Sequence, residues 1–269
     1  MFNLENDEEE INPFTMLLTE PENGDPKSSS TLLASPGKPH LLPHYLRSND
    51  STLLIRQLPS QGLSFQLWPA ATTLVTLLDD HRCDPSKSPL APFLPSRRPL
   101  KILELGSGTG LVGIAAAATL GASVTATDLP HVIPNLQFNV DENAAVLKSN
   151  GGEVIAAPLR WGEAEDVEVI GREFDLILAS DVVYHDHLYE PLYKTLCLLL
   201  KGKTTSFVMA HLKRWKKESG FFKKVKSTFG VEILHVEKPS EGKRVGVVVY
   251  RFVGKKVGKK PKGDDVVLL

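Results

Sequence analysis

The sequence predicts an α/β protein built on a doubly wound, mostly parallel seven-stranded sheet. An apolar run at 100–105 is followed by glycines at 106, 108 and 110 and then by an Ala-rich helical segment. Strand and helix patterns alternate along the rest of the chain, which is typical of parallel strands with helices on both faces. The last two strand patterns are joined by only 237–244, too short for a crossover helix, so we expect them to pair antiparallel.

Ahead of the glycine motif the sequence predicts a short N-terminal hairpin and a helix. Two strand patterns, 53–58 and 63–68, are joined through a Pro-Ser-Gln-Gly turn. Pro69 then opens a helix over 70–80, because proline fits the first helical position. The Pro- and Ser-rich run at 83–97 is expected to be a surface connection leading into the glycine strand.

The remaining elements follow from periodicity. Strands are expected at 100–105, 123–128, 153–158, 174–180, 204–210, 231–236 and 245–252, and helices at 111–120, 131–143, 188–201 and 216–228. We divide the chain into a disordered acidic and polar tail (1–45), a hairpin, helix and Pro-rich connection (46–98), a core domain (99–253) and a Lys-rich tail (254–269). The first tail contains five acidic residues at 5–10 and too little apolar surface to offset its ordering entropy.

Composition excludes several classes of protein. The chain has 269 residues, 42% of them hydrophobic, which is enough for one sizeable domain, and its net charge of −1 argues against a nucleic-acid or membrane coat. The two cysteines, Cys83 and Cys197, lack the spacing of a zinc site or disulfide framework. An acidic N-terminus without a long apolar run predicts a cytoplasmic location, and five lysines at 254–263 suggest a nuclear location as an alternative.

The glycine motif predicts a bound adenosine-type cofactor, because a strand, a tight glycine turn and a helix let the backbone approach such a ligand closely. Glu104 stands two residues before the first glycine, where its carboxylate would repel a pyrophosphate and suit an amino group. This favours S-adenosylmethionine, although Gly108 to Gly113 also match the dinucleotide fingerprint. Asp128 ends the next strand, where it is placed to accept hydrogen bonds from ribose hydroxyls; a cap for the following helix is the structural alternative, and the two roles can coexist.

A second candidate site follows the strand at 174–180, which ends in Asp181-Val-Val-Tyr184. Ligands of parallel sheets bind at the carboxyl ends of strands, so both side chains should lie beside the cofactor's reactive end. Methyl transfer to an amine needs an in-line approach, a neutral nitrogen and acceptors for developing positive charge. A carboxylate and a phenol oxygen supply such acceptors. The structural alternatives are a helix cap for Asp181 and a packing role for Tyr184.

Residues 50–252 resemble the seven-strand protein-lysine methyltransferases that modify chaperones and the valosin-containing ATPase. The resemblance lies in Trp68-Pro-Ala-Ala, the glycine motif, Asp128, Leu159-Arg-Trp161-Gly and Asp181-Val-Val-Tyr184. It implies that Asp181 and Tyr184 are catalytic and face the target nitrogen. The cofactor-binding residues expected from the motif and the resemblance together are Trp68, Glu104, Gly106, Ser107, Gly108, Thr109, Gly110, Asp128, Leu129, Trp161 and Ser180.

The resemblance implies an enzyme that methylates lysine in a partner protein, such as a chaperone or ATPase, and we expect it to act as a monomer. A methyltransferase for nucleic acid or a small molecule is the alternative, but its typical Asn-Pro-Pro-Tyr is replaced here by Asp-Val-Val-Tyr. A binding module without turnover, or a dinucleotide oxidoreductase, is the third class. We expect no metal, since His185, Asp186 and His187 are consecutive and cannot converge on one ion. The basic and aromatic segment 211–226 fits an amphipathic helix better than an RNA site.

Overall fold

The computed structural model describes residues 40–95, 99–200, 204–214, 218–239 and 246–255. Backbone contacts divide the chain into residues 1–35 and residues 36–269, and every described residue belongs to the second unit. Most of the two predicted tails, 1–39 and 256–269, therefore lies outside the described residues, as do the first two residues of the helix predicted at 216–228.

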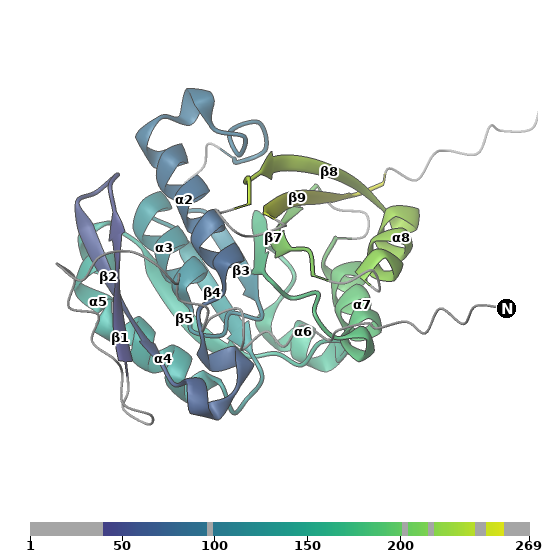
Figure 1. Ribbon diagram of the computed structural model, residues 1–269, viewed down its shortest axis with the longest axis horizontal. Helices are drawn as coiled ribbons and strands as arrows, with labels where there is room; N and C mark the ends of the chain where they lie inside the picture. The colour runs from purple at the N-terminus through teal and green to yellow at the C-terminus, as the bar shows by residue number, and fades with distance from the viewer. Residues whose placement is uncertain (1–39, 96–98, 201–203, 215–217, 240–245, 256–269) are drawn as a thin grey trace, which may run out of the picture. The chain divides into compact units, whose positions relative to one another are not determined.

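The central sheet has seven strands in the order β5-β4-β3-β6-β7-β9-β8 (Figure 1). The strands are β3 (Lys101–Leu105), β4 (Ser123–Asp128), β5 (Glu153–Pro158), β6 (Leu176–Ser180), β7 (Ser206–Leu212), β8 (Phe229–Val236) and β9 (Val247–Gly254). Strands β3 to β7 pair in parallel, whereas β9 runs antiparallel to both β7 and β8. The predicted fold class and its antiparallel closing pair are confirmed.

The helices are α2 (Pro69–Cys83), α3 (Leu111–Leu120), α4 (Ile133–Glu142), α5 (Ala144–Ser149), α6 (Ala164–Ile170), α7 (Tyr189–Leu200) and α8 (Glu218–Thr228). Two short ones were not predicted. Helix α5 continues the helix predicted at 131–143 after an interruption at Asn143. Helix α6 buries only Val167, and one buried residue gives no detectable helical periodicity.

Both faces of the sheet are covered, because side chains of a strand point alternately to opposite sides. On β3, Ile102 packs in the cluster that includes residues of α2 and α3, while Leu103 packs in the cluster that includes residues of α7 and α8. The same alternation on β6 places Leu178 in the first cluster and Ile177 in the second.

The N-terminal hairpin differs from the prediction. It pairs β1 (His40–Leu46) with β2 (Ser51–Gln57), whereas the expected second strand at 63–68 contains a 3-10 helix, η2 (Leu63–Phe65). A preceding 3-10 helix, η1 (Pro59–Gln61), and Gly62 at φ +121° turn the chain away from a strand path. Strand β1 begins inside the region predicted to be disordered up to residue 45. Pro43 obscured its pattern, and an edge strand tolerates proline.

Three buried asparagines on one face of α4 and α5 hold the hairpin: Asn135, Asn139 and Asn143. The Asn143 amide accepts from the backbone N–H of Leu54 and donates to its carbonyl, both at 2.9 Å. Asn139 accepts from the Arg56 N–H at 2.7 Å and donates to its carbonyl at 3.1 Å. Side-chain amides thus satisfy the edge of β2 that a third strand would otherwise cover.

Replacing Asn139 with alanine should lower the free energy of unfolding by about 2–4 kcal/mol, because backbone groups of Arg56 and the carbonyl of Thr109 lose their partner. Urea denaturation followed by circular dichroism measures this loss. Gln137→Ala, at an exposed position of the same helix, is the matched control and should change stability by about 0.5 kcal/mol or less. Equal losses in the two variants would contradict a role for the asparagine face.

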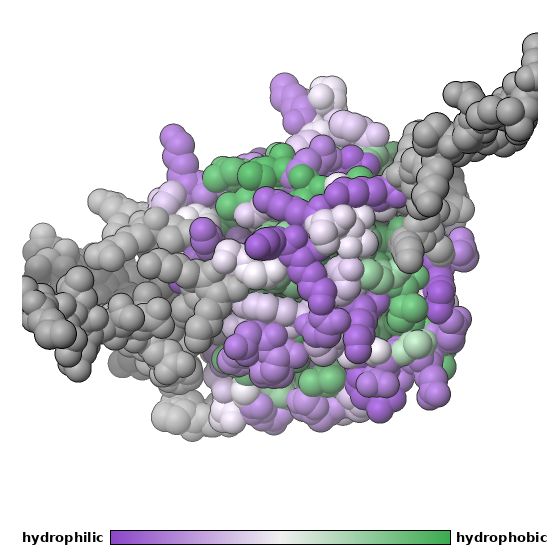
Figure 2. All heavy atoms as spheres, turned by 90° about the vertical axis from the view of Figure 1, so that its right-hand side faces the viewer, coloured by the Kyte–Doolittle hydropathy of each residue, from purple (hydrophilic) through white to green (hydrophobic). Residues whose placement is uncertain are grey.

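Figure 2 shows the side of the molecule that carries α8 and β8, where hydrophilic side chains surround a smaller hydrophobic area. Strand β8 is an edge of the sheet and has a register shift between Ile233 and His235. Such irregularities discourage pairing with another chain. Among the described residues, no helix is both long and apolar enough to cross a bilayer.

Candidate active site

The candidate site lies at the carboxyl ends of β3, β4 and β6. The chain adds β4 and β5 on one side of β3, and then β6 and β7 on the other. Open α/β sheets bind their ligands outside such a reversal point. Glu104, Asp128 and Ser180 lie on three neighbouring strands there, as predicted, and Asp181 directly follows the third strand.

The glycine loop lies at the end of β3. Gly106, Gly108 and Gly110 have φ values of +65°, +54° and +85°, a region that favours glycine. A Cβ at Gly108 would lie 2.9 Å from the backbone oxygen of Ser64, so η2 passes directly against the loop. The side chains of Ser107 and Thr109, predicted cofactor residues, are largely buried within the loop.

Asp128 fastens this loop to β4. Its Oδ2 accepts from the backbone N–H of Gly108 and its Oδ1 from that of Leu129, both at 2.7 Å. Burial raises the pKa of Asp128, and these two hydrogen bonds oppose the rise. The helix-cap alternative is not what the structure shows, since α4 has Val132 at its N-cap and no side-chain cap there. Leu129 is exposed beside the strand end.

Glu104 is buried under the loop, with 1% of its surface exposed. Its Oε2 accepts from the backbone N–H of Gly113 at 3.0 Å, and a Cβ at Gly113 would lie only 2.6 Å from that oxygen. Burial raises the pKa of Glu104 from 4.5 to about 8, while the hydrogen bond from the Gly113 N–H pulls it down and the charge of Asp128 adds to the rise. A nearby cation would favour the ionised carboxylate.

Two half-buried tryptophans flank the loop. Trp68 precedes α2, and its Nε1 donates to the Leu63 carbonyl of η2 at 3.0 Å. Trp161 lies on the other side, where its Cζ2 is 2.9 Å from the position of a Cβ on Gly106. The indoles therefore approach the loop from two different segments of the chain.

The segment that carries Trp161 is fixed by an ion pair. The Asp166 carboxylate accepts from three nitrogens of Arg160, the backbone N, Nε and Nη2, at 2.8, 2.9 and 2.7 Å. The Arg160 guanidinium lowers the pKa of Asp166 to about 2. Gly162, at φ +88°, donates its N–H to the Thr195 hydroxyl at 2.8 Å and so attaches the segment to α7.

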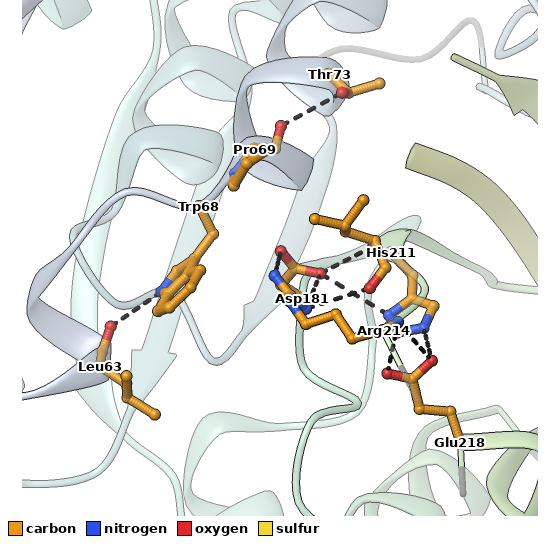
Figure 3. A network of polar contacts seen from close by, with 9 residues as sticks. Leu63, Trp68, Pro69, Thr73, Asp181, His211, Arg214 and Glu218 are labelled. Atoms are coloured by element: carbon orange, nitrogen blue, oxygen red, sulfur yellow. Dashed lines mark hydrogen bonds and ion pairs between the residues drawn. The ribbon is translucent and has the colours of Figure 1, made fainter. Parts of the chain in front are cut away.

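Asp181 occupies the left-handed region at φ +55°, which is uncommon for a residue with a side chain. Its carboxylate is held by the protein (Figure 3): Oδ2 accepts from Nη2 of Arg214 at 2.9 Å, and Oδ1 accepts from Nη1 at 3.2 Å and from the Leu212 N–H at 3.0 Å. Asp181 does not cap the next helical turn, because η4 (Asp186–Leu188) has His185 at its N-cap.

No sequence motif indicated Arg214 and His211, which contact Asp181, or Glu218, which bonds both of them. His211 Nδ1 lies 3.8 Å from Asp181 Oδ1, and its Nε2 lies 3.0 Å from Glu218 Oε2. A signal was available, because His211 directly follows the strand predicted at 204–210, and the carboxyl ends of parallel strands lie at one edge of a sheet. Because 211–226 was predicted to form an amphipathic helix, its polar residues were not considered as part of the site.

Tyr184 is half-buried, three residues beyond Asp181. Burial raises the pKa of its phenol above 10, and the negative charge of Asp128 adds to this rise, so the hydroxyl stays protonated at neutral pH. Its ring centroid lies 4.8 Å from that of His185, which stacks on His187 at 5.3 Å. Within the part of the chain that the structure describes, no group of three or more His, Cys, Asp or Glu side chains is placed to hold a metal ion.

Comparisons with known proteins show which family the sequence of this chain matches. A family model described as lysine methyltransferase matches residues 47–228, a range that includes every candidate site residue. Protein N-lysine methyltransferase METTL21A of Danio rerio is 32% identical over 195 residues, which cover 72% of this chain and 79% of that protein. EEF1A lysine methyltransferase 3 of Xenopus tropicalis is 31% identical over 181 residues, 67% of this chain and 72% of that protein.

A further match spans less of its relative. Protein-lysine N-methyltransferase rrg1 of Schizosaccharomyces pombe is 34% identical over 149 residues, which cover 53% of this chain and 45% of the yeast protein. The family match runs from the hairpin to α8, and it and the zebrafish relative each cover more than two thirds of the chain. The chain belongs to the lysine methyltransferase family.

Proposed function

We propose that this protein transfers a methyl group from S-adenosylmethionine to the side-chain amine of a lysine in a partner protein. One observation supports this most strongly: a positive-φ glycine loop, a buried carboxylate at a strand end and two tryptophans adjoin the Asp181–Tyr184 turn at the sheet's reversal point. The family to which the chain belongs supports the same reaction.

The residues present fit the cofactor. The loop from Gly106 to Gly110 exposes backbone at a position where side chains would clash, and Asp128 is placed to accept from ribose hydroxyls. The indoles of Trp68 and Trp161 are flat surfaces for stacking, and Glu104 suits an amino group. When bound, S-adenosylmethionine supplies an electrophilic methyl group on a sulfonium. A pyrophosphate would meet the Glu104 carboxyl, which argues against a dinucleotide.

The acceptor side of the site has two oxygen-bearing groups, Tyr184 and Asp181. The protonated Tyr184 phenol accepts an N–H of the incoming amine through its oxygen and stabilises positive charge as the new bond forms. Asp181 lies at the end of β6, where its carboxylate is paired with Arg214. The target lysine must first lose a proton, and desolvation near aromatic rings lowers its pKa.

The partner is proposed from resemblance and from relatives. The family resemblance suggests a chaperone or an ATPase, whereas the frog relative is named for lysine methylation of EEF1A. We propose that the protein acts as a monomer on a folded partner.

Incubation of the purified protein with methyl-tritiated S-adenosylmethionine and a cell lysate, followed by a denaturing gel, tests the reaction. We expect a discrete labelled protein band that survives ribonuclease and whose label resides on lysine after hydrolysis. Label that disappears with ribonuclease, or label found only in small molecules, would replace this proposal with a nucleic-acid or small-molecule methyltransferase. Cofactor binding without any label would point to a binding module.

Tyr184→Phe should lower the rate of methyl transfer by about 10- to 100-fold, because the variant keeps the ring and removes only the oxygen that accepts from the amine. Cofactor affinity should stay within a few-fold, as measured by calorimetry. Tyr193→Phe, whose hydroxyl bonds Thr228 at 2.8 Å on the α7 side, is the matched control. An unchanged rate in Tyr184→Phe would remove the hydroxyl from the mechanism.

A further inference from the structure

We propose that Arg214 is a positioning residue for methyl transfer: it fixes the carboxylate of Asp181, and with it the turn that leads to Tyr184, against the tryptophan on the cofactor side. The inference rests on the proposed function and assigns a role to a residue that no sequence motif indicated. Arg214 lies after β7, ahead of α8 (Figure 3).

The ion pair is buried. The side chains of Arg214 and Asp181 have only 8% and 4% of their surfaces exposed. Removing two charges from water costs free energy that their attraction only partly returns, so such a pair is weak evidence for a stabilising role. The pair does fix the geometry, because two guanidinium N–H groups that bond both oxygens of a carboxylate hold the two side chains in one relative orientation.

The guanidinium joins the ends of two strands. It donates through Nη2 and Nη1 to Asp181 at 2.9 and 3.2 Å, and through Nη1 also to the Leu212 carbonyl at 3.2 Å. The Leu212 N–H in turn donates to Asp181 Oδ1 at 3.0 Å. This closed ring of contacts holds Asp181 at its unfavourable φ of +55°, and therefore sets the direction in which the chain leaves β6 toward Tyr184.

Arg214 is itself held from α8. Glu218, the first residue of that helix, is fully buried, and its two oxygens accept from the Arg214 backbone N–H at 3.1 and 3.2 Å. The same carboxylate bonds His211 Nε2 at 3.0 Å. The backbone of Arg214 is thus anchored on one side, and its side chain reaches Asp181 on the other.

The guanidinium also faces the cofactor side. Its Cζ lies 5.4 Å from the centre of the Trp68 ring, a cation–π distance, and Figure 3 shows the indole turned toward the pair. The Trp68 Nε1 donates to the carbonyl of Leu63. The backbone oxygen of the next residue, Ser64, lies 2.9 Å from the position of a Cβ on Gly108. A continuous set of contacts therefore joins the glycine loop to Asp181, and Arg214 is the link between its two ends.

Four variants test this role: Arg214→Lys, Arg214→Met, Asp181→Asn and the double variant Arg214→Met with Asp181→Asn. Arg82→Met, at an exposed position of α2, is the matched control. The readouts are the initial rate of tritium transfer from S-adenosylmethionine to lysate protein, the cofactor Kd by calorimetry, and the Tm. The double variant removes both charges, so it avoids leaving Asp181 buried and unpaired.

We expect Arg214→Met to lower the methyl-transfer rate by about 100-fold or more, because a displacement of reacting groups by about 1 Å has this effect. The cofactor Kd should change less than about fivefold. Arg214→Lys should recover most of the Tm and little of the rate, because an ammonium cannot bridge both carboxylate oxygens. The double variant should be no slower than the slower single variant, since both act through one contact.

If the methyl-transfer rate fell in step with the Tm across the variants, and Arg214→Lys restored both together, the proposal would be overturned. Arg214 would then be a structural residue. A rate loss in the double variant equal to the product of the two single-variant losses would overturn the proposal as well. A failure of the proposed function looks different, because the wild-type protein would then label no lysate protein. That result would remove the reaction that Arg214 is proposed to serve, and the inference with it.

Discussion

Replacing Asp181 with alanine is expected to abolish methyl transfer and to lower the free energy of unfolding by about 3–5 kcal/mol, because a buried guanidinium is left without its carboxylate. The Leu212 N–H loses its acceptor as well, and alanine must adopt the left-handed backbone at this position. Urea denaturation gives the stability, and the tritium assay gives the rate.

Cofactor binding separates the two effects of this substitution. Measured well below the denaturation midpoint, the cofactor Kd of Asp181→Ala should stay within a few-fold of the wild-type value. Asp141→Ala, which removes an exposed carboxylate from α4, is the matched control and should leave stability and rate nearly unchanged. If Asp181→Ala lost cofactor affinity and rate in equal measure, Asp181 would be a structural anchor of the pocket.

Glu104→Gln is expected to stabilise the ligand-free protein at alkaline pH and to remove a decline in stability that the wild-type protein shows between about pH 4.5 and pH 8. Burial raises the pKa of Glu104 from 4.5 to about 8 in the folded chain. Each unit of difference between the folded and unfolded pKa corresponds to about 1.4 kcal/mol, so the effect is on the order of 3–5 kcal/mol.

The direction follows from proton uptake. Between the two pKa values the folded protein holds a proton on Glu104 that the unfolded chain has released, so its contribution to stability is complete below pH 4.5. That contribution is lost as the pH rises through the folded value near 8. Glutamine keeps an oxygen for the Gly113 N–H and carries no charge, so the variant should show no such decline.

Urea midpoints of the ligand-free protein from pH 4 to pH 9 measure this dependence. Glu142→Gln, on the exposed side of α4, is the control and should follow the wild-type curve. Parallel curves for wild type and Glu104→Gln would show that Glu104 ionises as it does in water. Because a cation is proposed to bind beside Glu104, the same variant should also bind S-adenosylmethionine about tenfold or more weakly.

Local signals were sufficient for the sheet. The strands at 123–128 and 153–158 and the helix at 111–120 were placed at their observed ends, because Gly110 and Gly121 mark the helix boundaries and Gly121 and Gly152 lie just ahead of the two strands. The hairpin was misplaced, because β1 contains Pro43 and the segment after Pro59 has strand-like residues in a 3-10 path. The pairing of β1 with β2 and the close approach of Ser64 to Gly108 decided those two cases.

The glycine loop, Asp128 and the Asp181-Val-Val-Tyr184 turn were indicated by the sequence, since each residue type is tied to a strand end or to a motif of fixed spacing, whereas the two tryptophans were indicated by the family resemblance. The roles assigned to them stay predictions. Only the tertiary structure decided which groups surround them. It joined Arg214 to Asp181 across 33 positions and Asn139 to Arg56 across 83. Such contacts depend on how elements pack, and no local pattern in the chain encodes a hydrogen bond between residues so far apart.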